Sequence, residues 1–79
     1  MMLRFGAKVR TLRKQRRLTL RDMADVLGVH YTHVQKIEAG RKRPSSDLIL
    51  KFAALFGVSA DQLMRDDLDI EMDERTEQT

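Results

Sequence analysis

The sequence is poor in several residue types that small proteins use for stability or chemistry. Among its 79 residues there is no cysteine, no tryptophan and a single proline, and aromatic residues make up 5%. Without cysteine there are no disulfides and no cysteine-based zinc sites. Because aromatic residues are scarce, leucine, valine, isoleucine and methionine must fill the core. A large enclosed active site, and hence an enzyme, is not expected.

Long hydrophobic runs are also missing. No apolar stretch approaches the roughly 20 residues that a membrane-spanning helix requires, so we expect no membrane span. A chain of this length has room for one small domain. Such a domain buries only about 60% of the surface that its unfolded chain exposes, and a partner subunit is one common way to compensate.

Charge is distributed unevenly along the chain. The net charge is +3, but residues 1–64 hold 13 Lys/Arg against 5 Asp/Glu, a net +8, and residues 65–79 hold 2 Arg against 7 Asp/Glu, a net −5. This pattern divides the chain into a basic domain (1–64) and an acidic tail (65–79). A basic domain of this kind favours a polyanionic partner, and the alternative is a generic basic surface.

The spacing of apolar residues predicts an all-α domain of five helices. The first runs from residue 5 to about 16, where Phe5, Val9 and Leu12 form an apolar stripe and Lys8 and Arg10 lie off it. The others are expected over 20–27, from 29–30 to about 39, from 45–46 to 56, and over 60–64. Their predicted boundaries rest on Thr19, Ser45 or Ser46, and Ser59 as N-caps and on Gly28 and Gly57 as helix ends.

The tail has a different pattern. Residues 67–73 alternate polar and apolar side chains, as half-exposed β-strands do. An all-helical domain offers no sheet, so such a strand would pair with its copy in a second subunit. A disordered acidic tail and an extension of the last helix are the alternatives, and all three stay open here.

Residues 20–39 read as two short helices joined by a glycine turn, which is a helix-turn-helix. Ala24 is small where the two helices cross, Gly28 suits the turn, and Val34 and Ile37 anchor the second helix. The exposed face of that second helix then carries polar side chains that can hydrogen-bond: His30, Tyr31, Thr32, Gln35 and Lys36.

With its Ile-Glu-x-Gly-x-x-x-Pro-Ser segment at 37–45 and Leu-Phe-Gly-Val-Ser at 55–59, the chain resembles the Cro/CI-type helix-turn-helix family, the lambda-repressor-like fold. The resemblance covers residues 5–64. It implies that the third helix enters the DNA major groove. The implied base-reading residues are Tyr31, Thr32, Gln35 and Lys36, with His30 at the helix entrance.

The resemblance also implies contacts outside the third helix. The implied phosphate-binding residues are Thr19, Arg21, Arg41, Lys42 and Arg43, and Arg17 adds a further cation. Arg13 and Glu38 match positions that form a mostly buried ion pair in this family, against the alternative of two unrelated surface charges. Phe52 and Phe56 could belong to the core or to a dimer surface, since Phe56 and Leu63 lie where family members often form dimers.

Two positions depart from the family pattern. Leu20 stands where the family usually has a glutamine that grips a phosphate and braces a base-reading side chain. Arg17 stands where glycine is frequent between the first two helices. A left-handed conformation at Arg17 would cost roughly 1 kcal/mol.

The expected function is that of a sequence-specific regulator of transcription that binds double-stranded DNA, as a homodimeric repressor on an inverted-repeat operator. Two alternatives are an antitoxin that binds both DNA and a toxin protein, and a protein-interaction module with this fold. The expected location is the cytoplasm, at the nucleoid of a prokaryote or in a phage-infected cell. We expect no cofactor and no metal, because His30 and His33 lack further ligands nearby.

Overall fold

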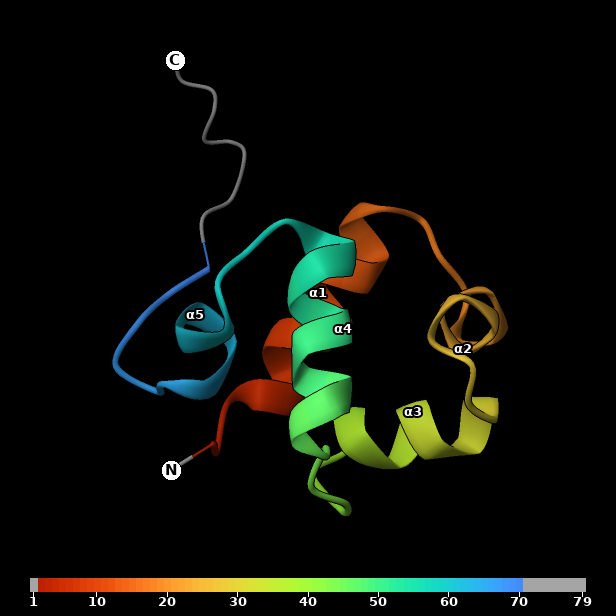
Figure 1. The fold of residues 1–79 in the computed structure, drawn as a ribbon, viewed down its shortest axis with the longest axis horizontal. Coiled ribbons are helices and arrows are strands. Elements are labelled where there is room, and N and C mark those ends of the chain that lie inside the picture. The colour runs from red at the N-terminus through yellow and green to blue at the C-terminus, as the bar shows by residue number, and fades with distance from the viewer. Residues whose placement is uncertain (1, 71–79) are drawn as a thin grey trace.

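The computed structural model describes residues 2–70, and five helices account for most of that range (Figure 1). Their bounds agree with the all-α prediction to within one or two residues. The helices are α1 (Phe5–Gln15), α2 (Leu20–Leu27), α3 (Tyr31–Glu38), α4 (Ser46–Phe56) and α5 (Ala60–Met64). None of the helices among these residues is long and apolar enough to cross a membrane.

Side chains at the helix ends explain where the helices start and stop. At α2 the Thr19 hydroxyl accepts from the Asp22 backbone N–H, and the Asp22 carboxylate accepts from the Thr19 backbone N–H. Ser59 and Gln62 form the same reciprocal capping box at α5. Gly28 closes α2 in the left-handed conformation, with φ +75°. These caps confirm the boundaries that the sequence predicts for α2 and α5.

The core lies between α1, α4 and the helix-turn-helix formed by α2 and α3. The Phe5 ring of α1 meets the Phe52 ring of α4 edge to face, with centroids 5.7 Å apart. Gly6 lies against the carbonyl oxygens of Ile37 and Glu38, so a larger residue there would push α1 away from α3. The buried apolar residues are Phe5, Val9, Leu12, Met23, Ala24, Leu27, Val34, Ile37, Leu48, Ile49, Phe52, Ala53, Phe56 and Leu63.

Residues 65–70 follow α5 and fold back beside α1 (Figure 1). They form a turn and an irregular stretch with no β-strand up to residue 70. The remainder of the alternating segment, residues 71–73, and the rest of the expected tail to residue 79 lie outside the described residues. The described part of the acidic segment therefore packs against the helical body, and we refer to it as the C-terminal turn (65–70).

Candidate nucleic-acid interface

Helix α3 lies along one edge of the molecule, with one face in the core and the other in solvent (Figure 1). Val34 and Ile37 are buried, and they anchor the helix as the sequence predicts. Gln35 and Lys36 are exposed, and Thr32 is half-buried. The side chains of Gln35 and Lys36 form no hydrogen bond or ion pair with the described residues, so their polar groups are available to a ligand.

His30 is the N-cap of α3 and not its first residue, so the helix starts slightly later than the sequence indicated. The ring Nδ1 of His30 accepts from the Thr32 backbone N–H at 3.2 Å and lies 2.9 Å from the Thr32 hydroxyl. This geometry fixes the ring and leaves Nε2 as its donor. His30 and Thr32, both expected at the DNA surface, are thus held together at the entrance of α3.

Tyr31, the first residue of α3, is half-buried in a stack of planar groups. Its ring centroid lies 4.8 Å from that of His30, with an interplanar angle of 28°. The guanidinium carbon of Arg21, near the start of α2, lies 4.1 Å from the centroid of the same ring. The structure therefore brings together Arg21, which the resemblance implied as a phosphate ligand, and Tyr31, which it implied as a base reader.

The start of α2 is occupied by its own cap. The Thr19 hydroxyl accepts from the Asp22 backbone N–H. Hydrogen bonding of the Asp22 carboxylate to the Thr19 backbone N–H, and secondly to the Thr19 side chain, holds the pKa of Asp22 below its ordinary value of 3.8. The groups that a phosphate would meet at this end are the backbone N–H groups of Leu20 and Arg21, which precede the first intrahelical hydrogen bond.

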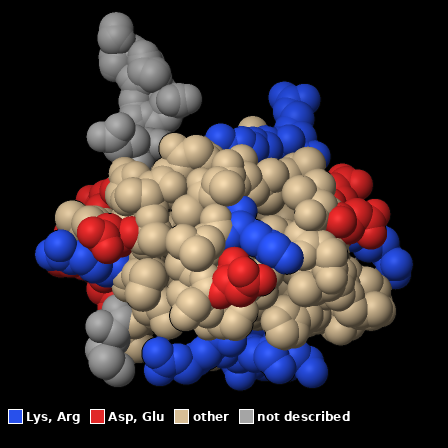
Figure 2. All heavy atoms as spheres, in the orientation of Figure 1, with Lys and Arg blue, Asp and Glu red and all other residues tan. Residues whose placement is uncertain are grey.

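The turn after α3 carries three exposed cations. Gly40 takes φ +78°, and the Arg41 backbone N–H donates to the Lys36 carbonyl at 2.8 Å, which closes the end of α3. Arg41, Lys42 and Arg43 are exposed, and their side chains pair with no group in residues 2–70. Figure 2 shows a band of Lys and Arg along the edge where Figure 1 places α3 and this turn. We call Lys36, Arg41, Lys42 and Arg43 the recognition-face cations.

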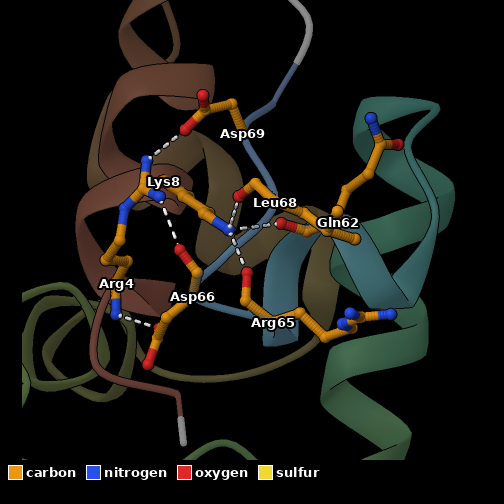
Figure 3. A network of polar contacts seen from close by, with 7 residues as sticks. All are labelled: Arg4, Lys8, Gln62, Arg65, Asp66, Leu68 and Asp69. Carbon is orange, nitrogen blue, oxygen red and sulfur yellow. Dashed lines mark hydrogen bonds and ion pairs between the residues drawn. The ribbon is translucent and has the colours of Figure 1, made fainter.

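A second basic group, Arg4 and Lys8 of the N-terminal region, differs from the recognition-face cations because its side chains are bonded within the fold (Figure 3). Lys8, which the sequence places off the apolar stripe of the first helix, is nevertheless buried, with 3% of its surface exposed. Its ammonium group donates to three backbone carbonyls, those of Gln62 at 2.6 Å, Arg65 at 2.7 Å and Leu68 at 2.6 Å. Desolvation by burial, with Arg4 nearby, lowers the pKa of Lys8, and the carboxylates of the C-terminal turn oppose this.

Arg4 binds the same turn from its other side. Its backbone N–H donates to the Asp66 carboxylate at 2.9 Å, and its guanidinium donates to the Asp66 carbonyl at 2.7 Å and to the Asp69 carboxylate at 2.8 Å (Figure 3). The Arg4 backbone N–H is the main cause that lowers the pKa of Asp66 below 3.8. Arg4, the N-cap of α1, and Lys8, within that helix, are thus satisfied within the molecule, and we call these two residues alone the α1 cations.

Comparison with known proteins identifies the type of interface. The helix-turn-helix domain family matches residues 4–66, which is most of the chain. The chain belongs to the Cro/CI-type helix-turn-helix family. The fold matches the restriction-modification controller protein C.AhdI from Aeromonas hydrophila with a TM-score of 0.71 at 27% identity, over 78% of this chain and 94% of that one.

Two further solved structures agree with the Cro/CI-type assignment. The N-terminal DNA-binding domain of SinR from Bacillus subtilis matches with a TM-score of 0.73 at 25% identity, over 81% of this chain and 94% of that one. The clp gene regulator ClgR from Corynebacterium glutamicum matches with a TM-score of 0.69 at 30% identity, over 75% of this chain and 63% of that one. No curated protein sequence matches the chain. The family match and these three structures together show that the protein is homologous to helix-turn-helix regulators of transcription.

Leu20 replaces the glutamine that is usual at this position in the Cro/CI-type family, and so removes a polar group from the surface beside α3. Its half-buried side chain packs against the core, and it lines a shallow depression together with Gln35 and Arg10. A leucine has no amide with which to grip a phosphate or brace a base-reading side chain. Gln35 is therefore positioned by its helix alone among the described residues.

Arg10 is the residue of this surface that sequence analysis missed. It is exposed, its side chain has no partner within the described residues, and it borders the depression beside Gln35. The available signal was the three-residue spacing of Arg10 and Arg13, which places both on one side of α1. Arg17 itself has φ +56°, the left-handed conformation considered for it, and ends α1 where the family often has glycine.

The structure pairs Arg13 with Glu38 and so ties α1 to the end of α3. The Arg13 Nε donates to Glu38 Oε2 at 2.8 Å and its Nη2 to Oε1 at 3.1 Å, while Nη1 donates to the Leu18 carbonyl at 2.9 Å. The two side chains are 12% and 7% exposed. This bidentate pair fixes the position of the C-terminal end of α3 relative to α1, next to the recognition-face cations.

Proposed function

We propose that this protein is a sequence-specific repressor of transcription that binds an inverted-repeat operator in double-stranded DNA as a homodimer. The observation that carries the proposal is the exposed polar face of α3, flanked by cations that have no partner in the described part of the chain. Both features fit a helix that enters the major groove between two phosphate backbones.

The residues of α3 suit the edges of base pairs. The amide of Gln35 matches the N6 and N7 groups of adenine, and the ammonium of Lys36 matches O6 and N7 of guanine. The recognition-face cations of the turn, Arg10 and the α2 backbone N–H groups lie around this helix and suit phosphate oxygens. Direct base contacts would then supply specificity, and the surrounding cations would supply affinity.

The proposal of a dimer follows from the small size of the reading element. Helix α3 has eight residues, which reach only a few base pairs. Each mismatched base pair costs about 1–3 kcal/mol, so one half-site discriminates weakly. Two copies on half-sites one helical turn apart, about 34–36 Å, double the sequence that is read. Such a dimer can repress by blocking access of polymerase to a promoter.

The experiment that tests this function is selection of bound duplexes from a randomised double-stranded library by the full chain. We expect enrichment of two inverted copies of one short sequence, spaced by about one helical turn. Gln35→Ala should flatten the preference at one position of each copy. Arg41→Ala is the matched control, and it should weaken binding to all duplexes about equally.

Each outcome of the selection bears on a different part of the proposal. No enrichment at all would contradict sequence-specific binding. A single, unrepeated sequence would contradict the dimer. If Gln35→Ala kept the preference of the wild-type protein, α3 would not be the reading helix.

A further inference from the structure

The planar groups of Arg21, Tyr31 and His30 form a stack within the proposed DNA surface. Arg21 and Tyr31 belong to different helices, and the 4.1 Å separation of guanidinium carbon and ring centroid is a close cation–π contact. His30 lies against the same ring at 4.8 Å and is itself fixed by its bonds to Thr32. The Tyr31 ring is therefore restrained both by α2 and by the N-cap of α3.

Arg21 makes no other specific side-chain contact within the described part of the chain. Its side chain forms no hydrogen bond or ion pair with any group in residues 2–70, and Asp25, one helical turn further along α2, lies beyond ion-pair distance. Tyr31 is only half-buried, so part of the residue remains accessible at the start of α3. An aromatic edge at this end of a recognition helix suits an apolar group in the major groove, and the only such group on DNA bases is the C5-methyl of thymine.

We infer that Tyr31 reads the C5-methyl group of a thymine and that Arg21 is the positioning residue that holds the Tyr31 ring for this contact. The inference rests on the proposed DNA-binding function and deepens it. It also revises the role that the resemblance implied for Arg21, from phosphate ligand to a residue that acts through Tyr31. A lysine at position 21 would keep the charge but lose the planar group that stacks.

The test uses the duplex enriched in the selection, with deoxyuridine replacing one thymine at a time, and fluorescence anisotropy with the full chain. Deoxyuridine removes only the methyl group and keeps every hydrogen-bonding atom. For the wild-type protein we expect one thymine in each half-site at which the replacement weakens binding about fourfold, the effect of losing one buried methyl group. Tyr31→Phe should keep this sensitivity, because the ring remains.

Tyr31→Leu and Arg21→Lys should abolish the sensitivity to deoxyuridine, while Arg21→Lys leaves the slope of log affinity against log salt unchanged. Arg21→Lys in the Tyr31→Leu background should have no further effect. In the free protein, stacking should shift the Arg21 side-chain protons upfield in the NMR spectrum, and Tyr31→Leu should remove this shift. Circular dichroism of each variant checks that it is folded.

Several results would overturn the inference. If Arg21→Lys retained the deoxyuridine effect, or the Arg21 protons showed no upfield shift, Arg21 would not position Tyr31. If Arg21→Lys bound like the wild-type protein and Arg21→Gln lowered the salt slope by about one, Arg21 would be a phosphate ligand. If no thymine were sensitive while Gln35→Ala still changed the selected sequence, this inference would fail and the proposed function would stand. If no duplex were enriched, both would fail.

Discussion

The recognition-face cations and the α1 cations carry charge of the same sign but face different surroundings. Lys36, Arg41, Lys42 and Arg43 are exposed, and their side chains have no partner among residues 2–70. Arg4 and Lys8 are bound by the C-terminal turn, Lys8 through three carbonyls and Arg4 through two aspartates. The difference teaches that the count of basic residues does not locate an interface. We propose that the recognition-face cations, which have no partner among residues 2–70, mark it.

The C-terminal turn affects the distribution of charge on the surface in two ways. It binds the α1 cations, and it places acidic groups beside α1, away from the basic band along α3 (Figure 2). We therefore expect a polyanion to be drawn to the α3 edge more than to the side that carries the C-terminal turn.

The largest expected effect concerns the buried ion pair of Arg13 and Glu38 beside the recognition-face cations. Glu38→Ala should lower the free energy of unfolding by roughly 3–5 kcal/mol, because it leaves the Arg13 guanidinium buried without its carboxylate. Urea denaturation measures this loss, with the exposed Asp47→Ala as control. In a double-mutant cycle with Arg13→Ala, a coupling energy near zero would show that the pair does not hold α1 and α3 together.

The next effect tests whether the α1 cations serve the fold and not DNA. Lys8→Met should lower the free energy of unfolding by about 1–3 kcal/mol, since three carbonyls lose their donor. Lys14→Met, an exposed site on the same helix, should change it by less than about 0.5 kcal/mol. The folded Lys8→Met protein should keep the wild-type salt dependence of DNA binding. A reduced salt slope would place Lys8 at the DNA surface after all.

The smallest effect is a dependence of stability on acid pH. The folded state lowers the pKa of Asp66 below its ordinary 3.8, so the unfolded chain binds this proton more readily. The contribution of Asp66 to stability is therefore present above that ordinary value and is lost as the pH falls through the lower folded-state value. Thermal melts from about pH 6 to about pH 2 should show a steeper acid loss for the wild-type protein than for Asp66→Asn. Parallel curves would mean that the Asp66 bonds to Arg4 and Leu3 add nothing.

Local patterns in the sequence were sufficient for the helices and the helix-turn-helix. The apolar spacing of α1, the caps at Thr19 and Ser59 and the glycines at 28 and 57 are short-range signals, and each has a direct structural counterpart. Lys8 could not be predicted in this way. Its partners lie more than 50 residues along the chain, and a lysine beside an apolar stripe reads as exposed unless the path of the later segment is known.

The candidate site shows the same limit. Helical spacing places Gln35 and Lys36 on the outer face of α3, but the contact between Arg21 and Tyr31 depends on how α2 and α3 cross. Arg10 likewise joins the surface only through the packing of α1 against α3. Periodicity predicts which side chains share one face of a helix. Which side chains meet between two helices depends on the tertiary packing.

The most direct measurement of the central claim is the salt dependence of affinity for a double-stranded DNA oligonucleotide, with neutral variants of both basic groups. Arg41→Gln, Lys42→Gln and Arg43→Gln should each reduce the slope of log affinity against log salt by about 0.9, the value for one lost phosphate contact. Arg4→Gln, which removes the same charge from the group bound by the C-terminal turn, should leave the slope unchanged. An equal reduction for Arg4→Gln, or none for the three turn variants, would contradict the account.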